Sequence, residues 1–200
     1  MWLFFIFLFL LTGIAVIYFL GVWSNIRSAH TGIDQAWGQL KGVLEQRCST
    51  APDVINSCKM FLSAQEPALL EHFLSSSKKL NEALKFDNVS EIESSHALFQ
   101  KSVDALHEAS AKINKLKANK SFQASYKSLL ELSDQVNSLV KSYNQKSLSY
   151  NEYITKFPAT LFIAYLPGFG KRKLFTLEEE SIGGQNKSVK ANNRSPLQAN

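Results

Sequence analysis

The stretch FQASYKSLLELSDQVNSLVKSYNQKSLSYNEYITKF, residues 122–157, decides the fold of this chain. Its apolar residues recur at alternating spacings of four and three, a seven-residue repeat typical of long helices that pack side by side as in a coiled coil. We expect a single helix here, capped by Ser121 and stopped by Pro158. The residues of its buried seam are predicted to be Phe122, Tyr126, Leu129, Ser133, Val136, Val140, Tyr143, Ser147, Tyr150, Ile154 and Phe157.

The same repeat runs upstream through residues 26–61, with Arg47 in one seam position. Pro52 lies inside that repeat and is expected to kink the helix without ending it, since the pattern resumes at once. Two shorter helices are predicted at residues 68–86 and 90–116, the second capped by Ser90. No window alternates with period two. The chain is therefore predicted to be all-α, with an antiparallel four-helix bundle at residues 24–158.

Residues 1–23 contain no charged side chain and form the predicted transmembrane anchor. A helix of this length spans about 34 Å, which is enough for a hydrocarbon core of about 30 Å. Trp2 and Trp23 flank the stretch, where aromatic rings favour the membrane interface. A cleaved signal peptide would need a basic start, a shorter apolar run and a small-residue cleavage site, and the sequence has none of these. We expect a retained single-pass anchor that contacts lipid.

Basic residues follow the anchor and none precedes it, the nearest being Arg27, Lys41 and Arg47. The positive-inside rule then predicts that the N-terminus lies outside and the bundle in the cytoplasm. Cys48 and Cys58 lie about 15 Å apart on one predicted helix, too far for a disulfide. Free thiols suit a reducing compartment.

Residues 159–180 form an apolar and basic segment after the bundle. Because successive helices of an up-and-down bundle alternate in direction, this segment is expected near the membrane. Two interpretations remain open: it contacts the membrane interface, or it folds back to plug the end of the bundle. The first assigns lipid contacts to Phe162, Phe169, Lys171, Arg172 and Lys173. Residues 181–200 are predicted to be a disordered tail.

Several ordered motifs make the chain resemble the LemA family of bacterial membrane proteins. They are Ala36-Trp37 followed by Pro52, then Lys117-Ala118-Asn119, Tyr143-Asn144, Tyr150-Asn151, Phe157-Pro158 and Gly168-Phe169. The resemblance implies an N-terminal anchor and an antiparallel helical bundle. It implies no catalytic residue, because the family has no established activity. Some relatives are linked to membrane remodelling.

Motifs for catalysis are weak. Glu93-x-x-His96 has the spacing of a di-iron bundle motif, but Asp104-x-x-His107 lies on the same predicted helix and no second motif faces it. No nucleophile elbow or complete phosphate loop is present. The net charge of +5 comes without a dense basic face. We therefore expect no enzyme activity, metal, cofactor, nucleic acid or small-molecule substrate.

The two Tyr-Asn pairs allow two interpretations. Tyr143 and Tyr150 are seven residues apart in the seam and are expected to pack in the bundle, where their hydroxyls need partners. Asn144 and Asn151 could supply these partners locally or bind a partner protein. Taken together, the sequence predicts an interaction scaffold or adaptor at the inner membrane with an unidentified protein partner. The alternatives are a membrane-remodelling module and, less favoured, a metal-binding bundle enzyme.

Overall fold

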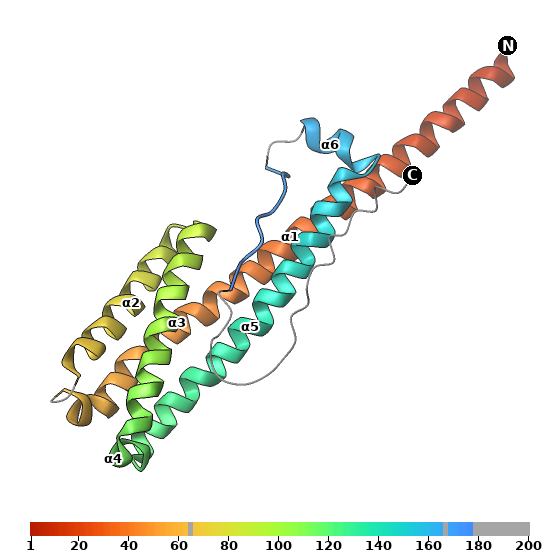
Figure 1. Ribbon diagram of the computed structural model, residues 1–200. Coiled ribbons are helices and arrows are strands. Elements are labelled where there is room, and N and C mark those ends of the chain that lie inside the picture. Colours follow the sequence, from red (N-terminus) through yellow and green to blue (C-terminus); the bar gives the residue numbers. More distant parts are fainter. Residues whose placement is uncertain (64–65, 166–167, 178–200) are drawn as a thin grey trace, which may run out of the picture.

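The computed structural model of the chain describes residues 1–63, 66–165 and 168–177. Within these residues there is no strand, so the predicted all-α class is confirmed. The six described helices are α1 (Trp2–Leu62), α2 (Pro67–Lys85), α3 (Val89–Lys112), α4 (Asn114–Lys117), α5 (Lys120–Thr155) and α6 (Ala159–Tyr165) (Figure 1). The predicted tail at residues 181–200 lies outside the described residues.

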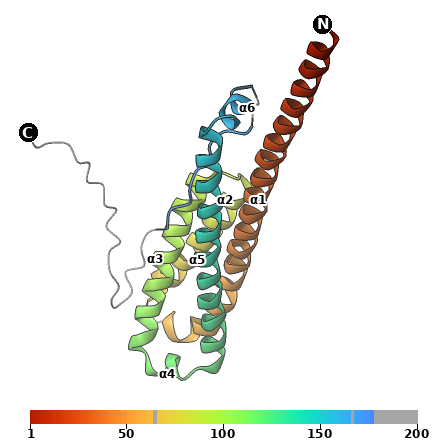
Figure 2. The same ribbon diagram turned by 90° about the vertical axis from the view of Figure 1, so that its right-hand side faces the viewer.

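Helix α1 carries both the apolar N-terminal segment and the first helix of the bundle. It is continuous over 61 residues, or roughly 90 Å. Residues 1–21 are exposed throughout, and burial of one face begins at Val22. Pro52 lies inside the helix, which continues to Leu62 as predicted. The apolar segment is thus rigidly joined to the bundle (Figure 2).

The long helices alternate in direction, and α5 runs back along α1 (Figures 1 and 2). Helix α2 packs against α1 and α3. In contrast, no Cα atom of α3 lies within 8 Å of a Cα atom of α5. The two helices are therefore bridged by side chains and by residues 168–177, which contact Glu93 of α3 and Asn144 of α5.

The seven-residue repeat locates the core correctly. From α1 the seam buries Ile26, Ile33, Leu40, Leu44, Arg47, Ala51, Val54 and Cys58. From α5 it buries Phe122, Leu129, Ser133, Val136, Val140, Tyr143, Ser147, Tyr150 and Ile154. Since fully burying one Leu or Ile side chain contributes about 1.5–3 kcal/mol, this continuous seam is the main source of stability.

Both predicted helix caps are wrong by two residues. The side chain of Asn88, not Ser90, caps α3 by accepting from the Ser90 N–H at 3.1 Å. Asn119, not Ser121, caps α5 by accepting from the Phe122 N–H at 3.0 Å. A capping residue needs a non-helical backbone, and both asparagines have it with ψ values of 105° and 109°.

The third helix also ends earlier than predicted. Ile113 adopts an extended backbone, with φ −108° and ψ 98°, so α3 stops at Lys112 and the short helix α4 follows. The predicted single helix over residues 90–116 is thus two helices. Leu116 is still buried, which explains why the apolar pattern continues across the break.

Phe157 is the one predicted seam residue of α5 that the structure leaves exposed, at 76%. Helix α5 ends at Thr155, and Lys156 is extended with ψ 148°. Pro158 does stop the helix, but the clash of its ring with the preceding residue already disfavours helix at Phe157. Phe157 therefore cannot continue the seam.

Helix α6 lies beside α1 where α1 leaves the bundle (Figure 1). Ala159 is buried there, whereas Leu161 is 47% exposed. The end of α5 thus lies next to the apolar part of α1, as the alternating helix directions predicted.

Candidate functional site

Residues 168–177, which we call the strap, run without helical structure along α5 (Figure 1). Phe169 meets Tyr150, and Lys173 meets Tyr143, so the strap is antiparallel to α5. Side chains of α1, α3 and α5 form the surface on which it lies. We call this surface the strap groove; its polar residues are His30, Asp34, Ser90, Glu93, Tyr143, Asn144, Tyr150 and Asn151.

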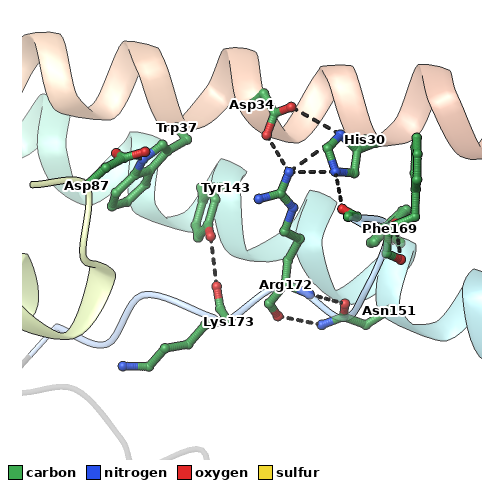
Figure 3. Close-up of polar contacts among 11 residues, drawn as sticks. His30, Asp34, Trp37, Asp87, Tyr143, Asn151, Phe169, Arg172 and Lys173 are labelled. Atoms are coloured by element: carbon green, nitrogen blue, oxygen red, sulfur yellow. Dashed lines mark hydrogen bonds and ion pairs between the residues drawn. The ribbon is translucent and has the colours of Figure 1, made fainter. Parts of the chain in front are cut away.

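Two asparagines of α5 bind the strap backbone in the same way. The Asn151 side chain donates from Nδ2 to the Arg172 carbonyl and accepts at Oδ1 from the Arg172 N–H, both at 2.8 Å (Figure 3). Asn144 makes the equivalent pair with Phe175 at 2.7 and 2.8 Å. Each amide satisfies both backbone polar groups of one residue, as a neighbouring β-strand would. The two asparagines therefore bind the strap through its backbone groups and not through its side chains.

The two tyrosines donate to further strap carbonyls. The Tyr143 hydroxyl donates to the Lys173 carbonyl at 2.8 Å, and the Tyr150 hydroxyl donates to the Phe169 carbonyl at 2.7 Å. Burial raises the pKa of both phenols, so both stay protonated and able to donate. The sequence left their partners open; the structure assigns them to the strap.

The spacing of the Tyr-Asn pairs matches the geometry of an extended chain. Asn144 and Asn151 are seven residues apart, which is about 10.5 Å along a helix. Arg172 and Phe175 are three residues apart, which is about 10 Å along an extended segment. Two helical turns therefore bring each asparagine to a strap residue without distorting either element.

Two cations of the strap lie on two carboxylates of the groove. Arg172 Nη2 is 2.6 Å from Asp34 Oδ1 on α1 (Figure 3). Lys173 Nζ is 2.8 Å from Glu93 Oε2 on α3. The other oxygen of Glu93 accepts from the Thr176 N–H at 2.6 Å. Both carboxylates thus fix the side chains and the register of the strap.

His30 of α1 contacts the N-terminal part of the strap. Its Nδ1 is 3.1 Å from Asp34 Oδ2, and its Nε2 is 2.7 Å from Arg172 Nη2. The Gly168 carbonyl oxygen also lies 3.2 Å from Nε2, so the ring is within hydrogen-bond distance of Asp34, Arg172 and the strap backbone. The same ring lies 4.8 Å from the ring of Phe169, which also contacts Trp23 at 5.3 Å.

Phe175 is the apolar anchor of the strap. It is 1% exposed, and its ring centroid lies 6.1 Å from Trp37 and 6.2 Å from His96. The Trp37 indole donates to Asp87 Oδ1 at 2.8 Å (Figure 3). Hydrogen bonds from Lys41 and Trp37 lower the pKa of Asp87. Trp37 therefore ties the turn between α2 and α3 to the strap.

Beneath Phe175 lies a buried polar network. Arg47 is fully buried and lies 3.0 Å from His96 Nε2, while it donates to Gln100 at 2.5 Å. Burial, with the Arg47 charge in addition, lowers the pKa of His96 to about 3. His96 is thus neutral and accepts from Arg47. Glu93 binds the strap, so Glu93 and His96 point to different partners.

Metal and thiol chemistry have no assembled site in the part of the chain that the structure describes. There, no group of three or more His, Cys, Asp and Glu side chains is arranged to hold a metal ion. Cys48 and Cys58 are buried free thiols, and burial raises the pKa of each to about 11. Both therefore stay in the unreactive protonated form at neutral pH.

The structure gathers about half of the sequence-predicted residues in the strap groove and its strap. The gathered ones are Trp23, Trp37, Tyr143, Asn144, Tyr150, Asn151, Gly168, Phe169, Arg172 and Lys173. Trp2, Ala36, Pro52, Lys117, Ala118, Asn119, Phe157 and Pro158 lie elsewhere in the fold. The side chain of Phe162 is outside the described residues, and Lys171 is exposed.

Sequence reasoning missed the binding roles of four groove and strap residues: His30, Asp34, Glu93 and Phe175. The His30-x-x-x-Asp34 spacing places both side chains on one helix face and is the only local signal for the pair. The described strap folds back along the side of the bundle, and not over the bundle end as a plug would.

The family model of the LemA family matches residues 36–190 of the chain. The matched range includes Trp37, both Tyr-Asn pairs and the whole strap. No curated protein matches the chain in sequence.

Proposed function

The chain belongs to the LemA family, and on that premise we propose that it is a single-pass membrane protein whose helical bundle is a non-catalytic interaction scaffold. The observation that carries the proposal is helix α1, which is long and apolar enough to cross a membrane and continues into the bundle core. Any partner bound by the bundle is then held at a fixed height above the bilayer.

Exposure of the N-terminal segment supports the anchor. Residues 1–21 are all exposed and most of them have large apolar side chains, a surface that needs an apolar partner. A hydrocarbon core of about 30 Å matches that length of helix.

We place the protein in the inner membrane with the N-terminus outside and the bundle in the cytoplasm. Arg27 and Lys41 lie on the bundle side of the anchor, and the two buried thiols are free. A reporter fused after Asn200 tests this orientation. Cytoplasmic reporter activity is expected, and activity on the outer side contradicts it.

Exposed apolar residues on the bundle provide a test of the scaffold. Leu98 on α3 and Leu130 and Leu148 on α5 are 37%, 40% and 47% exposed. A photo-crosslinking amino acid placed at each position in the full chain in cells should give discrete crosslinked proteins. The exposed Lys79 on α2 is the control position. Absence of discrete crosslinks at all three leucines contradicts a scaffold.

A second function, membrane remodelling, is favoured by α6. Leu161 of α6 and Phe157 just before it are exposed, and α6 lies beside α1. Anionic vesicles containing the full chain should change shape, and the effect should weaken when Phe157 and Leu161 are both replaced by Ser. Unchanged remodelling by that variant contradicts a role for α6.

A further inference from the structure

We propose that the strap groove is a binding site for an extended peptide and that residues 168–177 exchange there with the same segment of a second copy of this chain. In the exchanged pair, each strap lies in the groove of the other copy. The inference goes beyond the scaffold proposal, because exchange needs the groove and the strap and not the membrane.

The first step is that the groove recognises an extended backbone. Two phenols and two amides of α5 make six hydrogen bonds to strap backbone groups, two from the phenols and four from the amides. An extended peptide from another molecule presents the same donors and acceptors at the same spacing. Addition of an extended segment to preformed partners is a recurring mode of peptide recognition.

The second step is that the groove selects side chains at fixed positions. Phe175 fills the buried site beside Trp37, and Phe169 packs against Trp23 and His30. Between them Arg172 and Lys173 meet Asp34 and Glu93. The preferred peptide therefore has two aromatic residues six positions apart with an adjacent pair of cations between them.

The third step is that the strap can leave without breaking a helix. Among the described residues, the strap makes no backbone–backbone hydrogen bond with the bundle. All the contacts described above come from side chains of α1, α3 and α5. The helical hydrogen bonds of the groove thus remain when the strap is absent, and the groove persists as a site.

A second copy is the occupant that the observations favour. Its strap has the required pattern by identity, including both charges that complement Asp34 and Glu93. Exchange of an identical element gives each copy the same contacts as before. The product is a closed, symmetric dimer in which each groove holds the strap of the other copy. The competing arrangement is the strap of the same chain, whose effective concentration is on the order of millimolar.

The test uses two full-length variants with different tags, mixed in detergent. The groove variant carries Asn144→Leu and Asn151→Leu and keeps its strap. The strap variant carries Phe169→Ala and Phe175→Ala and keeps its groove. Neither can bind its own strap, so the mixed variants should copurify at least tenfold more than either variant with itself. Mixed copurification no greater than self-copurification overturns the proposal.

A labelled synthetic peptide of residues 168–177 keeps the test decisive if the groove variant does not fold. The peptide should bind the strap variant saturably, and the same peptide with Phe175→Ala should bind at least tenfold more weakly. The wild-type chain, whose groove is filled, should bind at least tenfold more weakly than the strap variant. A strap variant that binds neither peptide overturns the peptide site. The strap variant is also mixed with differently tagged wild-type chain. If the strap variant binds the peptide but does not copurify with the wild-type chain, the second copy is overturned as the occupant.

Discussion

Helix α5 meets its two neighbours in different ways. Against α1 it packs directly, through a seven-residue repeat of apolar side chains. Against α3 it has no close backbone approach, and the strap fills the upper part of the space with hydrogen bonds and ion pairs. The direct interface is apolar and non-directional, whereas the bridged interface depends on individual polar atoms. The first should resist small changes in position, and the second should be separable.

The largest expected effect distinguishes the two interfaces by removing one large side chain from each. Leu44→Ala opens a cavity in the direct interface and should lower the free energy of unfolding by about 2–5 kcal/mol. Phe175→Ala should instead detach the strap while the helices stay folded, and the free energy of unfolding should fall by no more than the docking free energy of the strap. Denaturant unfolding measures the first effect, and trypsin cleavage at Lys171, Arg172 and Lys173 measures the second. Cleavage of the strap only when the whole chain unfolds would contradict separability.

The next effect concerns His96, which lies between the strap and the buried network. Its folded-state pKa is about 3, below the ordinary value of 6.5, so the unfolded chain binds the extra proton first. Stability should therefore fall as the pH drops from about 6.5 toward 3, by about 1.4 kcal/mol per pH unit. The variant His96→Gln keeps an acceptor for Arg47 and should flatten this slope. If the free energy of unfolding falls equally with pH in both proteins over that range, His96 is not the cause of the pH dependence.

A smaller effect is expected from one amide of the bridged interface. Asn151→Leu removes both partners of the Arg172 backbone, which water can replace only in part, and should weaken strap attachment by about 1–3 kcal/mol. Trypsin should then cleave the strap at least fivefold faster. Gln135→Leu, at an exposed position of the same helix, also removes a side-chain amide; it is the control and should change nothing. Similar cleavage rates in the two variants would show that Asn151 does not hold the strap.

The smallest effect is electrostatic. Glu93→Gln keeps an acceptor for Thr176 but removes the charge opposite Lys173, an exposed side chain. Such a pair contributes about 0–1 kcal/mol and is screened by salt. Strap cleavage should be about two- to fivefold faster in the variant at low ionic strength and nearly equal to wild type in 1 M salt. A difference that persists in high salt points to a geometric cause.

The direct interface was predictable from sequence and the bridged one was not. The repeat identified Leu40, Leu44 and Val136 as core because apolar burial follows helical periodicity. The caps and the end of α5 were displaced by about two residues, since backbone conformation at Asn88, Asn119 and Lys156 decides them.

The strap has no periodicity, so its position could not follow from a repeat. The Tyr-Asn pairs indicated that α5 has polar partners but not which segment supplies them. Asp34 and Glu93 look like ordinary surface carboxylates in the sequence, and only the fold brings them to Arg172 and Lys173. The two Asn side chains bind backbone, which leaves no complementary pattern in the sequence of the strap.

Amide hydrogen exchange of Arg172 and Phe175 in the full-length chain tests most directly whether the asparagines of α5 bind the strap backbone. Each N–H donates to one Asn side chain at 2.8 Å. Both amides should exchange slowly in the wild type. Asn151→Leu should release Arg172, and Asn144→Leu should release Phe175, while the amides of α5 stay protected. Exchange of both amides at unprotected rates in the wild-type chain would contradict the account.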